Sequence, residues 1–242
     1  MYYKNGFTLV ELAVAMVIIG LLVGGVLKGQ ELIQNARLNR YVKQTTSYVA
    51  ALSAFYDKYR QWPGDLSNPG NKIIGCAALN TCVNAGGNGD SIVGVITNNW
   101  SRDDQSALNS EATQFWFHLT LSDFISGLTL ENSQGWGDLY PSSPLGGGFQ
   151  VAHVREAGEN PASGIFLISR DETTGDPHPS APGEAVLTPF QAAFIDRKID
   201  DGSPRSGAFL ADGVAGNCFN LTTFKYVEDS NDAICITAYK LR

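Results

Sequence analysis

Apolar residues fill the chain almost without interruption from position 7 to position 27. As an α-helix, these 21 residues would span roughly 30 Å at about 1.5 Å rise per residue, which matches the hydrocarbon core of a bilayer. One ionisable residue, Glu11, lies inside the run. A carboxylate in lipid costs about 2.5–3.5 kcal/mol on insertion scales, so we expect Glu11 to have a partner.

A second pattern follows the apolar run, and it is amphipathic. Apolar and aromatic residues recur at steps of three and four, which is typical of one face of a helix. Pro63 and Gly64 end this pattern, because proline cannot continue a helix and glycine permits a turn. We therefore predict one helix over residues 7–59, with a membrane-spanning part (7–27) and an amphipathic part (28–60) that packs under a globular head (61–242). The stripe consists of Leu38, Tyr41, Val42, Thr45, Tyr48, Val49, Leu52, Phe55, Tyr56 and Tyr59.

The head is expected to combine helices with an antiparallel sheet. Residues 61–99 are rich in glycine and asparagine and indicate irregular structure. Residues 111–125 predict a helix that Gly127 stops, and a second helix begins at Pro189 and ends at Gly202. Thr188 can cap that second helix, and Gln191 completes a capping box. Extended segments are expected at 146–154, 164–169 and 234–239, so the fold class is α+β.

The start of the chain resembles a known signal. Gly6, Phe7, Thr8, Leu9, Val10, Glu11 and Leu12 resemble the type IV prepilin signal, which is shared by pilins and by the pseudopilins of type II secretion. The resemblance implies that a prepilin peptidase removes residues 1–6 by cutting between Gly6 and Phe7, and that Phe7 is then N-methylated. It also implies that Glu11 pairs with the free amine of a neighbouring subunit during assembly.

An ordinary secretory signal is the alternative for this segment. Such signals have a basic n-region, a shorter apolar region and a small-x-small cleavage site. Here the leader carries only Lys4, the apolar run is long, and a glycine precedes it. These features favour the prepilin signal.

The resemblance also implies a location and a role. The chain would be a structural subunit of a type IV pilus-like filament, held in the inner membrane with its head in the periplasm before assembly. Its partners would be identical or related pilin subunits, the prepilin peptidase, the assembly machinery and the membrane. Two alternatives remain: a type II secretion pseudopilin, and a minor tip pilin whose head is an adhesive binding module.

Composition narrows the functional classes further. The net charge of −7 argues against a nucleic-acid-binding surface. Four cysteines beyond the apolar run are typical of an oxidising compartment. We pair Cys76 with Cys82 and Cys218 with Cys235 because both loops are local, although four cysteines permit three connectivities. The second loop resembles the carboxy-terminal disulfide loop of many type IV pilins.

The sequence offers few candidates for catalysis or cofactor binding. Three histidines lack partners at metal-ligand spacing, and no hydrolase, phosphate-binding or redox motif occurs, so we expect no enzyme and no cofactor. Calcium is the one metal considered, at Asn88 and Asp90 or at Asp200 and Asp201. A glycine-rich turn is favoured for the first pair and solvated charges for the second.

Overall fold

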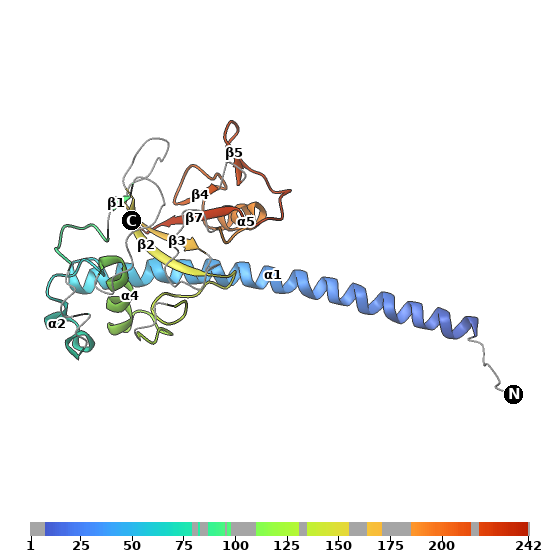
Figure 1. Cartoon of the computed structure of the whole chain (residues 1–242), viewed down its shortest axis with the longest axis horizontal. Coiled ribbons are helices and arrows are strands. Elements are labelled where there is room, and N and C mark those ends of the chain that lie inside the picture. Colours follow the sequence, from blue (N-terminus) through green and yellow to red (C-terminus); the bar gives the residue numbers. More distant parts are fainter. Residues whose placement is uncertain are drawn as a thin grey trace.

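The computed structural model describes residues 8–78, 82, 87–94, 96–97, 110–130, 135–154, 164–170, 185–213 and 218–241. One long helix runs past a head built from a sheet and shorter helices, and about half of the helix projects beyond the head (Figure 1). This is the expected α+β, pilin-like arrangement.

The long helix, α1, spans Leu9–Tyr59 and contains 51 residues, which corresponds to roughly 75 Å. Thr8 caps its start, and Arg60 ends it in the left-handed region with φ 55°. The prediction of a single helix ending at Tyr59 is confirmed. Its predicted first residue, Phe7, lies outside the described residues.

The head contains a five-stranded sheet in the order β1-β2-β3-β7-β4. β1 pairs with β2 in parallel, and the other three pairings are antiparallel. Val151 lies opposite Leu167, and Leu167 opposite Tyr239, so β3 is the middle strand and the carboxy-terminal strand lies between β3 and β4. The strands are β1 (Ile96–Thr97), β2 (Gly148–Val154), β3 (Gly164–Arg170), β4 (Phe209–Gly213) and β7 (Cys235–Lys240), with a separate hairpin of β5 (Phe219–Asn220) and β6 (Lys225–Tyr226).

Helices α4 (Glu111–Leu121) and α5 (Pro189–Ile199) form where the sequence predicts them, but both end early. α4 ends because Ser122 caps it and Asp123 adopts φ 62°, a value outside the helical range. α5 ends because Asp200 adopts φ −148° and ψ −146°. Between α1 and β1, the described residues include the short helix α2 (Pro69–Lys72) and the 3-10 turn η1 (Ile74–Ala78).

Strand β2 begins at Gly148 rather than at Gly146. Gly146 and Gly147 have φ values of 114° and 56°, which an extended strand does not permit. The two glycines therefore form the turn before β2, and the predicted extended segment is two residues too long.

The core lies between α1, α4 and the sheet. Tyr41 and Tyr48 of α1 contact the ring of Phe149 on β2, with centroids 5.2 and 5.7 Å apart. Tyr48 also meets Trp116 of α4 edge-on at 5.2 Å. The aromatic stripe of α1 is thus a packing surface, as its spacing predicts. The buried residues of α1 are the stripe members Leu38, Tyr41, Thr45, Tyr48, Leu52 and Phe55, together with Ala51.

The sheet is also buried on its other face. Ile165 and Leu167 of β3 point toward the main core, whereas Phe166 and Ile168 belong to a second cluster. Alternation along one strand produces these two faces. The run from Ile165 to Ile168 is therefore a strand buried on both sides.

Candidate functional site

The first turn of α1 holds Glu11, the candidate assembly residue. The Thr8 N–H and hydroxyl donate to Glu11 Oε2 at 2.9 and 2.8 Å, and the Glu11 N–H donates to Thr8 Oγ1 at 3.3 Å. This reciprocal pattern is a capping box, which satisfies two backbone donors at the helix start. Of the two capping boxes, only the one at Thr188 was predicted from the sequence, although Thr-x-x-Glu at residues 8–11 is the usual signature of such a box.

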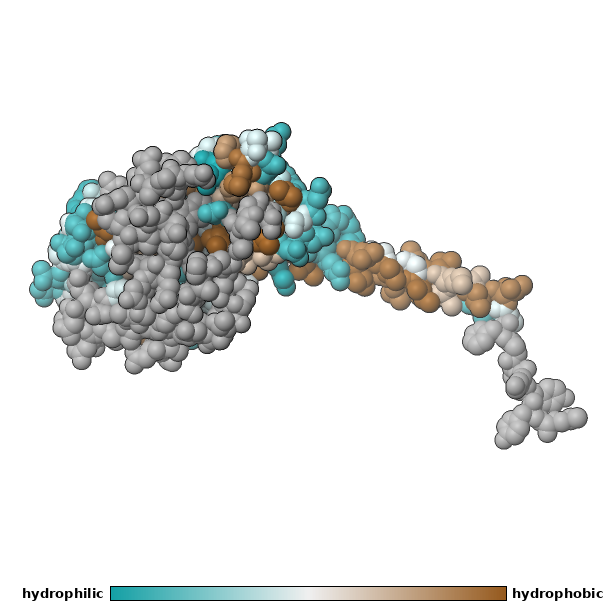
Figure 2. Space-filling view, turned by 45° about the horizontal axis from the view of Figure 1, so that its top comes forward, coloured by the Kyte–Doolittle hydropathy of each residue, from teal (hydrophilic) through white to brown (hydrophobic). Residues whose placement is uncertain are grey.

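Residues 9–33 of α1, here the exposed segment, make no contact that buries them in the head. Among the described helices, α1 alone is long and apolar enough to cross a membrane, by length and composition, and none of its most apolar window is buried. Its fifteen large hydrophobic side chains are 49% to 89% exposed. In Figure 2 this segment is an apolar rod beyond the head. Apolar surface of this extent indicates a membrane or protein partner.

The exposed segment contains four glycines, at positions 20, 24, 25 and 29. A Cβ added at any of them would have no heavy atom within 4 Å. Nothing in the described part of the chain therefore requires glycine at these positions. Small residues at i and i+4, such as Gly20 and Gly24, allow another helix backbone to approach closely.

Two disulfides stabilise the head, and they join the pairs that the sequence analysis expects. Cys76 bonds Cys82, with Cα atoms 5.3 Å apart, and Cys218 bonds Cys235, with Cα atoms 5.1 Å apart. The second bridge links β5 to the start of β7 across 17 residues. It encloses the β5–β6 hairpin and the loop that follows it.

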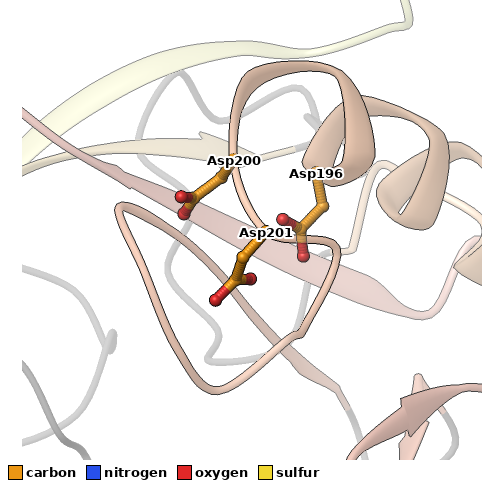
Figure 3. Close-up of side chains that lie close together, drawn as sticks. All are labelled: Asp196, Asp200 and Asp201. Atoms are coloured by element: carbon orange, nitrogen blue, oxygen red, sulfur yellow. The ribbon is translucent and has the colours of Figure 1, made fainter.

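Three aspartates gather where α5 passes into the following loop (Figure 3). Asp196, Asp200 and Asp201 each have a carboxylate oxygen within 4.8 Å of the others. Asp200 and Asp201 are the predicted candidates, and the structure adds Asp196, which lies one helical turn before Asp200. Carboxylate oxygens are ligands that Ca²⁺ prefers.

Each carboxylate of this cluster already accepts hydrogen bonds from the protein. Asp196 accepts from the Tyr226 hydroxyl at 2.7 Å and from the Gly202 N–H at 2.9 Å. Asp200 accepts from the backbone N–H groups of Ala208 and Phe209, and Asp201 accepts from the N–H of Ser203 and the hydroxyl of Ser206. The cluster therefore shapes the loop through its own hydrogen bonds.

Charge repulsion remains within this cluster. Burial, together with the charges of Asp201 and Asp200, raises the pKa of Asp196 to about 6, against the lowering effect of the bonds from Tyr226 and Gly202. Burial, and after it the neighbouring Asp196 carboxylate, also raises the pKa of the Tyr226 hydroxyl. A proton or a cation at the cluster would relieve the repulsion.

The other calcium candidates are engaged in a local turn. Asn88 Oδ1 accepts from the Asp90 N–H at 2.8 Å, and Asp90 Oδ1 accepts from the Ile92 N–H at 2.8 Å. The Asn88 amide donates to Asp90 Oδ2 at 2.9 Å. This geometry is that of the glycine-rich turn which the sequence analysis favours. In the described part of the chain, Asp90 belongs to no metal-like group of acidic, histidine or cysteine side chains.

His118 lies in the core, as a packing residue would. Its Nδ1 accepts from the Gly64 N–H at 2.9 Å, and its ring stacks on Phe55 with centroids 6.2 Å apart. Burial lowers the pKa of His118 to about 3, so the ring is neutral at pH 7. A neutral, enclosed imidazole that holds a backbone N–H has a structural role.

Comparison with known proteins gives one match. Residues 1–27 match a family described as a prokaryotic N-terminal methylation motif, which is the type IV pilin and pseudopilin signal. No curated protein and no solved structure matches the chain. The motif includes Gly6 and Phe7, which lie outside the described residues, and Glu11. It supports a pilin-like or pseudopilin protein with a structural rather than a catalytic role.

Proposed function

We propose that the chain is a structural subunit of a type IV pilus-like filament, cut after Gly6 and methylated at Phe7. The observation that carries the proposal is the exposed segment. From Leu12 to Leu27 it is apolar around its whole circumference, it begins inside the methylation motif, and it is continuous with the part of α1 that packs in the folded head. In the membrane, lipid would cover this segment. In a filament, the same segments of neighbouring copies would cover one another.

Glu11 would set the register of neighbouring subunits. In the single chain its carboxylate is bonded to Thr8, at the helix start. The cut after Gly6 would create an amine at Phe7, and an amine from a neighbouring subunit would offer Glu11 a full positive charge in place of a neutral donor. Pairing removes the desolvation penalty that each charge would otherwise carry in an apolar environment.

Substitution of Glu11 tests this role. We expect Glu11→Ala to be cut and methylated normally but to yield at least about tenfold less sheared filament, which corresponds to about 1.4 kcal/mol in assembly. Glu31→Ala is the matched control, because it removes an exposed carboxylate from the same helix that is paired only with Lys28. Filament yield equal to wild type for Glu11→Ala would overturn the pairing role.

The leader assignment needs a separate variant. Gly6→Ala should leave residues 1–6 attached, because the family's peptidase cuts after glycine. Mass spectrometry of the amino-terminal peptide gives the answer directly. Efficient removal of the leader from Gly6→Ala would place the cut elsewhere.

A pseudopilin or a minor tip subunit would have the same methylation motif, exposed segment and folded head as a major pilus subunit. Abundance in cell fractions separates the three. A major pilus subunit dominates a sheared cell-surface fraction, whereas a tip adhesin occurs there in traces. A pseudopilin stays with the envelope. Before assembly, each would be anchored in the inner membrane with its head in the periplasm.

Calcium at Asp196, Asp200 and Asp201 is a second proposal, favoured by the separation of at most 4.8 Å between their ligand oxygens. Bound Ca²⁺ would offset both the burial and the carboxylate repulsion that raise the pKa of Asp196. At 100 times its Kd, the ion would stabilise the head by about 2.7 kcal/mol. Thermal unfolding of the wild type and of Asp201→Asn, each with Ca²⁺ and with a chelator, measures the effect. Equal chelator sensitivity in both proteins would contradict this site.

A further inference from the structure

A basic groove lies beside α1 at the point where the helix enters the head. Its volume is about 490 Å³, and its walls come from α1 and from the turn before β2. The groove is lined by Arg40, Lys43, Gln44, Ser47, Ser142 and Ser143. Arg40 and Lys43 are one helical turn apart, so both cations face the same space.

The groove is held open by fixed contacts. The Gln44 amide donates to the Ser142 carbonyl at 2.9 Å, and this bond ties the turn to the helix. The same amide donates to the Tyr48 hydroxyl at 2.7 Å, which fixes the Gln44 side chain on α1. The Ser143 N–H donates to the Gly147 carbonyl at 2.9 Å, which closes the turn. A binding surface that is already ordered loses little conformational entropy on association.

The cations of the groove are unpaired. Arg40 and Lys43 are exposed, and neither side chain forms an ion pair or hydrogen bond with any residue that the structure describes. Residues 32–56 contain three basic residues, the third being Arg37, and no acidic residue. The groove therefore has an uncompensated positive charge and favours an anionic partner.

Phospholipid phosphates lie too far away to be that partner. If residues 7–27 span the hydrocarbon core, Arg40 lies 13 residues beyond Leu27, which is about 20 Å along a helix. The headgroup region of each leaflet is only about 5–8 Å thick. Lys28 and Glu31, rather than the groove, would lie at that level.

The head offers the complementary charge. Residues 61–242 contain 21 acidic and 10 basic residues. Within the described part of the chain, three carboxylates make no hydrogen bond or ion pair, and two of them, Asp229 and Asp232, lie on one loop. This acidic loop, residues 227–233, lies within the Cys218–Cys235 bridge, and Glu228 fixes it to α5 through two bonds to Arg197 at 2.8 Å.

We propose that the groove of one copy binds the acidic loop of a second copy, through Arg40 and Lys43 against Asp229 and Asp232. Two unpaired cations meet two unpaired carboxylates, and the exposed side chains of Phe224 and Val227 add apolar contact beside them. The two surfaces are different parts of the chain, so the contact is heterologous and can repeat without closure, as an open helix of subunits requires. The inference rests on the proposed filament function and names a contact between heads that would add to helix packing.

Charge exchange between the two surfaces tests the contact in cells that assemble the full chain. The groove variant carries Arg40→Glu and Lys43→Glu, and the loop variant carries Asp229→Lys and Asp232→Lys. We expect each variant alone to lower the yield of sheared filament at least about tenfold, and their combination to recover it to within about threefold of wild type. Arg37→Glu and Asp123→Lys are matched controls, because each reverses an exposed charge outside the two surfaces, and both should assemble normally.

The outcomes separate this inference from the proposed function. If the wild type yields no filament containing the Phe7 peptide, the proposed function fails. If the wild type assembles and both single-surface variants also assemble normally, only the contact is overturned. The same conclusion follows if the combined variant yields no more filament than the variant with the lower yield. A photoreactive residue in place of Ser143 gives a second readout on otherwise native chains. It should crosslink to a peptide containing Asp229 and Asp232 of another copy, and a crosslink to lipid instead would contradict the contact.

Discussion

The two ends of α1 differ in what covers them. The exposed segment, residues 9–33, is apolar on all sides from Leu12 to Leu27, and none of its large apolar side chains is buried by the described part of the head. The packed segment, residues 38–59, has one apolar stripe, and its members are buried or half-buried in the core of the head. One continuous helix therefore contains a part whose sequence the single chain explains and a part whose sequence it does not.

This difference shows where to look for other molecules. In the packed segment, every large apolar residue of the stripe has a partner within the chain, such as Phe149 for Tyr41. In the exposed segment, a Cβ added at any glycine would meet no described residue within 4 Å, and every large apolar side chain is exposed. Full burial of one such apolar side chain gains about 1.5–3 kcal/mol, so covering this segment is the main driving force available for insertion or assembly.

The largest effect should come from a cavity in the packed segment. Phe55 is completely buried and contacts Tyr59, His118 and Phe124. Phe55→Ala should lower the free energy of unfolding of the head by about 3–5 kcal/mol. Ile19→Ala, on the exposed segment, should change it by less than about 0.5 kcal/mol. Unfolding of the full chain in detergent micelles compares the two, and equal losses would contradict the division of the helix.

The disulfides sharpen the same comparison, because both lie in the head. Replacing Cys218 and Cys235 with alanine opens a loop of 17 residues, and should cost about 3 kcal/mol in the chain-entropy model. The Cys76–Cys82 loop has a separation of 6, and its loss should cost about 2 kcal/mol. Chemical denaturation of each double variant measures both values. A larger loss from the shorter loop would show that chain entropy is not the main contribution.

A pH titration examines the core against which the packed segment lies. Because the pKa of His118 is lowered to about 3 in the folded state, only the unfolded chain gains a proton as the pH falls below 6.5. The contribution of His118 to stability is therefore complete above pH 6.5 and decreases toward pH 3. Between pH 7 and pH 5 this contribution should fall by about 2 kcal/mol.

The control for this titration is His118→Gln, which keeps an acceptor for the Gly64 N–H and does not titrate. Its free energy of unfolding should depend less on pH over the same interval by about 2 kcal/mol. Identical pH dependence in the variant and the wild type would show that His118 is not the responsible group.

The smallest effect on the head is expected from the exposed glycines. Gly24→Ala adds a Cβ that meets nothing within 4 Å, so the stability of the head should change by less than about 0.5 kcal/mol. Gly64→Ala is the contrast, because Gly64 has φ +87° and a Cβ there would lie 2.3 Å from the Glu111 carbonyl oxygen. That substitution should cost about 1–3 kcal/mol. A filament defect in Gly24→Ala, with an unchanged head, would locate close helix packing at this glycine.

Local patterns predicted the elements that depend on local physics. The three- and four-residue spacing from Leu38 to Phe55 identified the buried face of α1, and Thr188 with Gln191 identified the start of α5. The helix ends were less accurate, because they depend on single dihedral angles such as φ 62° at Asp123.

Contacts between distant parts of the chain were not predictable from such patterns. The place of β7 between β3 and β4 arises from pairing with strands that lie earlier in the chain. The groove combines residues 40–47 with residues 142–144, and no sequence pattern joins these two segments. Asp196 was not predicted to lie beside Asp200 and Asp201, because its position depends on where α5 ends. The i, i+4 spacing of Asp196 and Asp200 was nevertheless an available signal.

The central claim is that the exposed segment acts as an assembly helix after the cut at Gly6. Quantitative mass spectrometry of the sheared cell-surface fraction and of the envelope fraction tests it most directly, through the peptide that begins at Phe7. If the exposed segment is the assembly helix, this peptide is methylated and abundant in the sheared fraction. Retention of Met1 in every fraction would contradict the account, because the exposed segment would then be only a membrane anchor.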